Sequence, residues 1–278
     1  MNRFITLLLL SFSCSLIQAG APNLLVITVD DMSCDSAGVF DGVIPDLTPH
    51  MDQLASEGLR FEMAHVQVGN CYPSRNVMFS GQYPHSSGVE GFYQVNNDYP
   101  VFCDVMKKAG YFTAIRGKVS HSTPYQPYAW DADLTIKEDG KKEHIKDVVS
   151  YGTSLTKGIY LAKQANKPFA ININISDPHK PFWFDGDPHG VSRIYTAEES
   201  PIPGFLFDDP AVRNELALYY TSVRRADDAL GAILSALQKS GQEENTIVVF
   251  LSDHGMPLPF AKTQLYHHST RTPLIIRW

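Results

Sequence analysis

Two acidic segments of this 278-residue sequence each follow an apolar run that is long enough to be a buried strand. Asp30 and Asp31 come directly after residues 24–29, and Asp253 and His254 follow residues 247–251. Adjacent carboxylates repel each other unless a cation lies between them, and a lone Asp-Asp pair is more often a solvated turn. Three carboxylates and an imidazole from two strand ends suit one shared ion, and mostly oxygen ligands favour Ca²⁺ or Mg²⁺ over Zn²⁺.

A second chemical feature is the segment Cys71-Tyr72-Pro73-Ser74-Arg75, which leads into a predicted short helix that ends at Phe79-Ser80-Gly81. A cysteine at a helix start and beside an arginine lies in a field that favours an anion. The alternative is a buried structural thiol, the commoner fate of a lone cysteine.

The Cys-x-Pro-Ser-Arg pattern resembles the signature of the sulfatase family, which formylglycine-generating enzymes read. Five further elements resemble the family in the same order along the chain. They are Asn23–Asp31, Gly117-Lys118-Val119-Ser120-His121, Asp177-Pro178-His179, Ser252-Asp253-His254-Gly255, and Lys262 ahead of Thr270–Leu274. The resemblance therefore spans nearly all of the chain.

This resemblance implies a fold similar to that of alkaline phosphatase and hydrolysis of sulfate esters or sulfamates on a sulfated glycan. It implies that Cys71 is converted to Cα-formylglycine, whose hydrate attacks sulfur, and that one Ca²⁺ is bound. The implied metal ligands are Asp30, Asp31, residue 71, Asp253 and His254. Arg75, Lys118 and Lys262 would neutralise the sulfate, His179 would protonate the leaving group, and His121 would take the proton of the second hydroxyl.

Within the family, residues 255–260 and 211–226 look most like the heparan N-sulfatases, or sulfamidases. Two positions depart from that branch, with Lys262 in place of an arginine and His254 in place of an asparagine. The choice between O-sulfate and N-sulfate therefore stays open, as do the glycan and the position of its sulfate.

Alternating strands and helices would position these residues. The pattern predicts strands at 24–29, 111–115, 169–175, 247–251 and 274–276, and helices from Thr48-Pro49 to Gly58, from about 100 to 109, and from Asp209-Pro210 to Gly241. Strands that are apolar on both faces and separated by helices predict an α/β fold with a mostly parallel central sheet and helices on both faces. Residues 122–147 and 178–209 lack periodicity and are expected to be surface loops.

Residues 1–21 have the pattern of a secretory signal, with Arg3, an apolar run at 4–10, and small residues at 19–21. We therefore expect an exported protein, periplasmic or secreted, without a stable membrane anchor, whose catalytic domain occupies residues 22–278. The net charge of −7 argues against nucleic-acid binding. The expected partners are a sulfated carbohydrate and a formylglycine-generating enzyme. Cys34 and Cys103 could be bonded or free.

Two alternatives remain open. One is a two-metal phosphodiesterase or phosphonate hydrolase of the same superfamily, although such sites usually present a Thr or Ser nucleophile. The other is a truncated, non-catalytic fragment, because the family resemblance implies a further C-terminal subdomain after residue 278.

Overall fold

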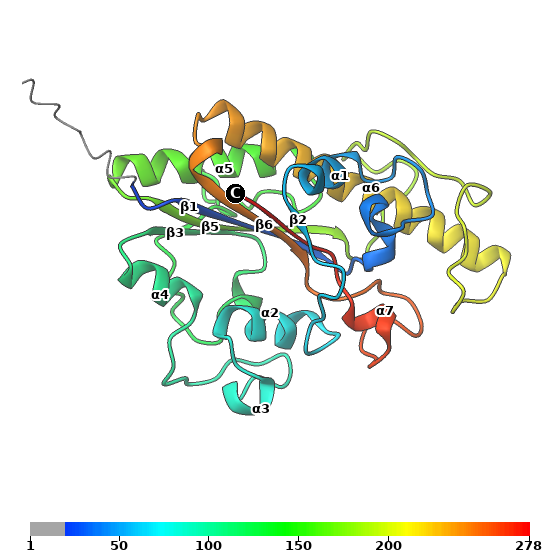
Figure 1. Ribbon diagram of the computed structural model, residues 1–278, viewed down its shortest axis with the longest axis horizontal. Helices are drawn as coiled ribbons and strands as arrows, with labels where there is room; N and C mark the ends of the chain where they lie inside the picture. The colour runs from blue at the N-terminus through cyan, green and yellow to red at the C-terminus, as the bar shows by residue number, and fades with distance from the viewer. Residues whose placement is uncertain (1–19) are drawn as a thin grey trace, which may run out of the picture.

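The computed structural model describes residues 20–278 and contains one seven-stranded mixed sheet (Figure 1). The predicted signal at residues 1–21 falls almost entirely outside these residues. The strands, in chain order, are β1 Asn23–Asp30, β2 Leu59–Arg60, β3 Phe112–Arg116, β4 Ala132–Asp133, β5 Phe169–Pro178, β6 Thr246–Ser252 and β7 Leu274–Arg277. Their spatial order is β2-β7-β6-β1-β5-β3-β4.

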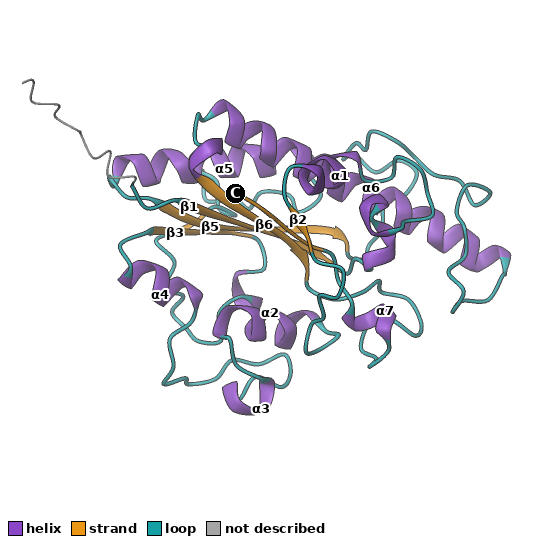
Figure 2. Cartoon of the chain, in the orientation of Figure 1, coloured by secondary structure: helices purple, strands orange, loops and turns teal. Residues whose placement is uncertain are grey.

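The α-helices are α1 Pro49–Ser56, α2 Cys71–Ser80, α3 Pro84–Ser87, α4 Phe102–Lys108, α5 Val148–Gln164, α6 Pro210–Lys239 and α7 His267–Thr270. Helices α1, α5 and α6 cover one face of the sheet, and α2, α3, α4 and α7 lie on the other side (Figures 1 and 2). The prediction of an α/β fold with helices on both faces is confirmed.

The sheet is parallel at its centre and antiparallel at one side. Strand β1 pairs parallel with β5 and β6, and β3 pairs parallel with β5 and β4. Strand β7 pairs antiparallel with β6 and β2. The carboxyl ends of β1, β3, β5 and β6 therefore meet at one edge of the sheet, where open α/β sheets place their sites.

Helix α5 has no counterpart among the predicted elements. Its buried residues include Tyr151, Leu155 and Ile159 at helical spacing, but Gly152 and Gly158 interrupt the apolar pattern. Both glycines are required by packing: a Cβ on Gly152 would lie 2.8 Å from the carbonyl oxygen of Ala232 in α6, and one on Gly158 would lie 2.8 Å from Ile171. The residues that weaken the helical signal are those that let α5 approach its neighbours closely.

The start of α1 differs from the prediction in its capping group. The side chain of Thr48 makes no capping hydrogen bond. Instead, the Asp227 carboxylate of α6 accepts hydrogen bonds from the backbone N–H groups of His50 and Met51 at 3.0 and 2.9 Å. A carboxylate at this end of a helix satisfies free N–H groups and complements the helix dipole.

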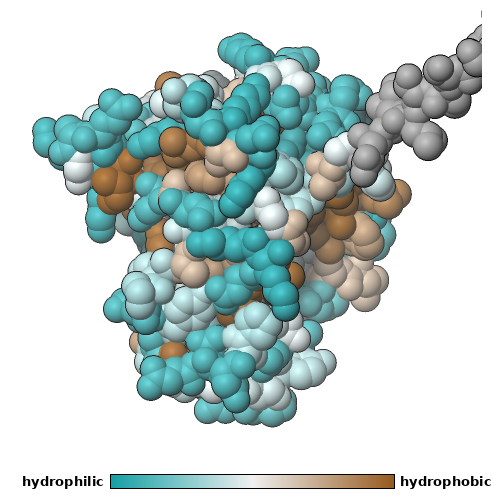
Figure 3. Space-filling model, turned by 90° about the vertical axis from the view of Figure 1, so that its left-hand side faces the viewer, coloured by the Kyte–Doolittle hydropathy of each residue, from teal (hydrophilic) through white to brown (hydrophobic). Residues whose placement is uncertain are grey.

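The two long segments are largely irregular, as predicted, with the short strand β4 and an isolated bridge between Ile136 and Lys142 as additions. The cysteines at 34, 71 and 103 are all free and buried, so Cys34 and Cys103 do not form a disulfide. Within residues 20–278, no helix combines the length and apolar character needed to cross a membrane. The face shown in Figure 3 is mainly hydrophilic, with hydrophobic residues in separate areas.

Candidate active site

Five of the predicted site residues converge at the carboxyl edge of the sheet. One potential ligand atom from each of them lies within 4.8 Å of all the others, and all five side chains are buried. The five are Asp30, Asp31, Cys71, Asp253 and His254. They come from the ends of β1 and β6 and from the first residue of α2. Among the described residues this is the single group of His, Cys, Asp and Glu side chains close enough to hold a metal ion.

A shift in strand register brings a further segment to this edge. Val29 of β1 pairs with Ile175 of β5, but the next residue, Asp30, pairs with Pro178. The extra residues of β5 form an irregularity of the kind that re-aims side chains near active sites. As a result, the Asp177-Pro178-His179 turn lies beside the first carboxylate of the cluster.

Helix α2 places Cys71 and Arg75 on the same side, one turn apart. Asn70 caps the helix by accepting a hydrogen bond from the backbone N–H of Cys71 at 3.0 Å. Gly81 ends it in the left-handed conformation, with φ of 68°. The predicted helix start and stop of this motif are therefore confirmed.

Arg75 is completely buried between two carboxylates. Its Nε donates to Oδ2 of Asp253 at 3.0 Å, and its Nη2 lies 3.4 Å from Oδ1 of Asp30. Burial would raise the pKa of Asp30, but Arg75 and Lys118 hold it well below its ordinary value. Burial dominates at Asp253 and raises its pKa to about 6.

Two lysines complete the set of cations. Nζ of Lys118 lies 2.6 Å from Oδ2 of Asp30, and Nζ of Lys262 lies 2.8 Å from Oδ2 of Asp31. Lys118 and Asp31 both adopt left-handed backbone conformations, with φ of 48° and 68°. Such conformations are uncommon for residues other than glycine and cluster at functional sites. The three cations balance the three carboxylates of the cluster.

Cys71 is influenced by two histidines. Nε2 of His254 is 3.3 Å from its Sγ. Burial opposes ionisation, but the interactions of the thiol with His179 and His254 outweigh it and hold the pKa of Cys71 below its ordinary value. The interaction with Cys71 likewise raises the pKa of His179.

The ring of His121 lies beside two aromatic side chains. Its ring packs against Tyr72 and Phe92, with centroids 5.1 and 5.8 Å away. The carbonyl of His121 accepts a hydrogen bond from Asn76 at 2.9 Å, which joins the 119–121 turn to α2. Burial, reinforced by Lys118, lowers the pKa of His121 to about 4, so its imidazole is neutral at ordinary pH.

The cluster has the chemistry of a hard-cation site. Oδ2 of Asp30 is buried, and Nζ of Lys118 lies 2.6 Å from it. Nδ1 of His254 lies 2.9 Å from the carbonyl oxygen of Gly255, the kind of backbone partner that leaves Nε2 free as a ligand. Carboxylate oxygens predominate among the donors, which suits Ca²⁺. The residues present therefore fit a bound divalent ion.

Sequence reasoning missed Asn174, which links several of these groups. Its Oδ1 accepts from Thr28 at 2.9 Å and from Nη1 of Arg75, and its Nδ2 donates to the carbonyl of Gly117 at 2.8 Å. The signal that could have found it is an amide at every second position of an otherwise apolar strand, Ile171-Asn172-Ile173-Asn174-Ile175.

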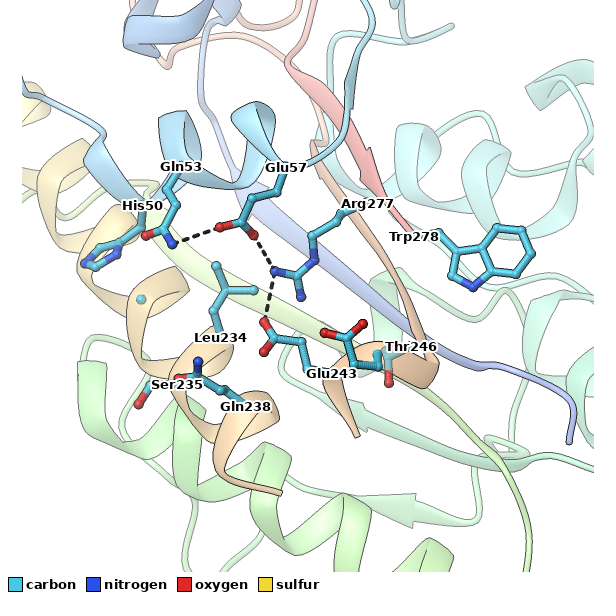
Figure 4. Close-up of a pocket in the computed structure, with 12 residues that line it drawn as sticks. His50, Gln53, Glu57, Leu234, Ser235, Gln238, Glu243, Thr246, Arg277 and Trp278 are labelled. Atoms are coloured by element: carbon cyan, nitrogen blue, oxygen red, sulfur yellow. Dashed lines mark hydrogen bonds and ion pairs between the residues drawn. The ribbon is translucent and has the colours of Figure 1, made fainter. Parts of the chain in front are cut away.

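The pocket in Figure 4, of about 590 Å³, lies away from this site. It is lined by Thr246 at the amino end of β6 and by Arg277 at the end of β7. Arg277 pairs there with Glu57 at 2.8 Å and Glu243 at 3.1 Å. None of the predicted site residues lines this pocket, so the candidate site is identified from its chemistry instead.

Comparison with known proteins reveals close relatives among sulfatases. The chain is 30% identical to human N-sulphoglucosamine sulphohydrolase over 94% of this chain and 56% of that protein. It is 25% identical to an ulvan-active sulfatase of Formosa agariphila over 92% of this chain and 47% of that protein. The chain thus spans about half the length of the curated relatives it matches.

Solved structures share the fold. A protein bound to its substrate D-glucosamine-2-N,6-O-disulfate matches with a TM-score of 0.71 at 21% identity, covering 93% of this chain and 71% of that one. The phosphonate monoester hydrolase of Agrobacterium radiobacter matches with a TM-score of 0.65 at 17% identity, covering 92% and 68%. The family model described as Sulfatase matches residues 22–278, so the predicted resemblance to this family is confirmed and the chain belongs to the sulfatase family.

Proposed function

We propose that this chain is an exported hydrolase that removes sulfate from a sulfated glycan, with formylglycine at position 71 and one bound Ca²⁺. The observation that carries the proposal is the position of Cys71, whose Sγ lies among the buried carboxylates and His254 and one helical turn from Arg75. The family membership and the sulfated sugars named for its relatives support the substrate class.

The charges of the site suit a sulfate group. Arg75, Lys118 and Lys262 balance Asp30, Asp31 and Asp253, so a divalent ion adds two net positive charges. That excess complements a sulfate and the negative charge that develops as its ester bond breaks. Ca²⁺ would supply positive charge for the sulfate oxygens and for the nucleophile.

Two histidines would carry out the two proton transfers of the reaction. Formylglycine at position 71 would supply, as its hydrate, a nucleophilic hydroxyl and a second hydroxyl on the same carbon. His179 would donate a proton to the leaving oxygen or nitrogen, in keeping with its raised pKa. Its Nδ1–H donates to the carbonyl of Lys180, which leaves Nε2 for this transfer. Neutral His121 would accept the proton of the second hydroxyl, whose loss releases sulfate.

The test is sulfate release by the chain produced together with a formylglycine-generating enzyme. N-sulfoglucosamine, glucosamine 6-sulfate and a sulfated disaccharide are offered with Ca²⁺ present. We expect release from at least one of them, formylglycine in the peptide that contains residue 71, and loss of release in Cys71→Ala and Cys71→Ser. Full release by Cys71→Ala, or unmodified Cys71 in active enzyme, would contradict the mechanism.

Two further outcomes would support the alternatives. Two equivalents of Zn²⁺ with phosphodiester hydrolysis would favour the two-metal phosphodiesterase. A folded chain with bound Ca²⁺ and formylglycine but no sulfate release would favour the non-catalytic fragment.

A further inference from the structure

A buried charge network lies directly behind His179. The Asp177 carboxylate accepts hydrogen bonds from Nζ of Lys146 at 2.7 Å and from Nε of Arg225 at 2.7 Å. Nη1 of Arg225 also donates to Asp187 at 2.7 Å. The side chains of Lys146, Asp177 and Arg225 expose 5%, 3% and 1% of their surface. Their charges are therefore compensated by one another and not by solvent.

This network joins parts of the chain that are far apart in sequence. Lys146 precedes α5, Arg225 lies in the middle of α6, and Asp177 is the penultimate residue of β5. Helices α5 and α6 lie side by side on one face of the sheet (Figure 1). The turn that carries His179 is therefore attached to the helical layer instead of being an independent surface loop.

Lys146 makes a second contact that reaches His179 itself. The same Nζ that binds Asp177 also donates to the carbonyl oxygen of His179 at 2.7 Å. Oδ1 and Oδ2 of Asp177 meanwhile both accept from Arg225, which fixes the carboxylate in two directions. Since one ammonium group holds both ends of the turn, a change at Lys146 would displace the His179 ring relative to Cys71.

We propose that Lys146, with Arg225 behind it, is a positioning residue that holds the His179 imidazole in place for proton donation to the leaving group. The inference rests on the proposed function, because it needs His179 to be the acid of sulfate transfer. It assigns a role to a buried lysine outside the metal cluster, whose Nζ contacts Asp177 and the carbonyl of His179. It also explains why a charged network is buried at this end of β5, where apolar packing alone would be at least as stable.

The role can be tested with two substrates that differ in their need for an acid. The leaving group of 4-nitrophenyl sulfate is a weak base and departs without a proton, whereas the sugar of glucosamine 6-sulfate or N-sulfoglucosamine needs one. We expect Lys146→Met to lower kcat/KM for the sugar substrate about 100-fold, the loss typical of a misplaced catalytic group, and to affect the aryl sulfate much less.

Two controls separate positioning from general damage. Lys157→Met removes a lysine of α5 whose Nζ donates to the carbonyl of Ile136 at 3.2 Å and, within residues 20–278, makes no ion pair. It should leave the ratio of the two activities unchanged. In a His179→Ala background, Lys146→Met should have less than about a threefold further effect on the sugar substrate, because the two changes remove the same function.

Equal loss on both substrates, or full additivity with His179→Ala, would overturn the positioning role while leaving the proposed function intact. No sulfate release from any substrate by the unaltered chain would overturn the proposed function and this inference with it.

Discussion

Nζ of Lys262 lies 2.8 Å from Oδ2 of Asp31, although 231 residues separate the two in sequence. Burial would lower the pKa of this lysine, but Asp31 and Cys71 outweigh burial and raise it. Lys262 is therefore protonated at the edge of the cluster. The contact places a third positive charge next to the candidate nucleophile.

The charge of Lys262 should therefore matter for turnover. We expect Lys262→Ala to lower kcat/KM for sulfate release about 100-fold or more, as loss of a group that stabilises developing charge usually does. Lys262→Arg, which keeps the charge, should retain more activity than the alanine variant. Lys141→Ala, at a largely exposed lysine outside the site, is the control. Activity of Lys262→Ala within a few-fold of the unaltered chain would exclude this role.

Arg75 should be essential for stability when no metal is bound. Arg75→Met leaves the buried carboxylates of Asp30 and Asp253 without their shared partner. Loss of one member of a buried ion pair costs about 3–5 kcal/mol in free energy of unfolding. Urea denaturation in EGTA measures this loss, and saturating Ca²⁺ should reduce it because the ion replaces the missing charge. A loss below about 1 kcal/mol would show that the carboxylates are stabilised in another way.

Asn172 and Asn174 offer a matched comparison on one strand, since they lie two residues apart on the same face of β5. Asn174→Ala removes partners from Arg75, Thr28 and the carbonyl of Gly117, which should cost about 1–3 kcal/mol and lower activity. In the described part of the chain, the side chain of Asn172 makes no hydrogen bond. Asn172→Ala should therefore cost less and leave kcat/KM nearly unchanged. Equal effects of the two substitutions would refute the assignment of Asn174 to the site.

Stability should depend on the protonation of His121. The native state holds it neutral to about pH 4, whereas an unfolded histidine binds a proton near pH 6.5. Its contribution to stability is therefore fully present above about pH 6.5 and is lost as the pH falls toward 4. Because the ring is partly exposed, we expect a loss of only about 1–2 kcal/mol.

The measurement is the difference in free energy of unfolding between the unaltered chain and His121→Gln, at pH 7 and at pH 4. That difference should shrink at the lower pH. A difference that stays constant between the two values would disprove the assignment.

Ca²⁺ should stabilise the folded chain through the five-residue cluster. At a concentration about 100 times its dissociation constant, a ligand that binds only the folded state adds about 2.7 kcal/mol. Calorimetry should show a higher Tm with Ca²⁺ than with EGTA. Asp31→Asn should lose most of this shift, and Asp139→Asn, at an exposed carboxylate, should keep it. An unchanged Tm on addition of Ca²⁺ would mean that the cluster does not bind the ion.

Much of the fold could be predicted from local pattern. The apolar runs before Asp30 and Asp253 form parallel neighbours, and the helix that begins at Asp209-Pro210 extends to Lys239 as its periodicity indicates. Helix α5 was not predicted because its packing against α6 and β5 requires glycines at positions where a helical pattern shows large apolar residues. The cap of α1 was predicted at Thr48, whereas the carboxylate that caps it comes from Asp227, 176 residues away from Met51.

The sequence by itself determined which side chains gather at the candidate site, because each follows a recognisable strand end or begins a recognisable helix. This holds for Asp30, Cys71, Lys118 and Asp253. Only the tertiary structure decided how they are held, through Asn174 beneath Arg75 and Lys146 behind His179. The reason is physical: strand ends and helix starts are local consequences of backbone and apolar pattern. A buried hydrogen bond depends on where two distant elements pack, and no spacing along the chain records that.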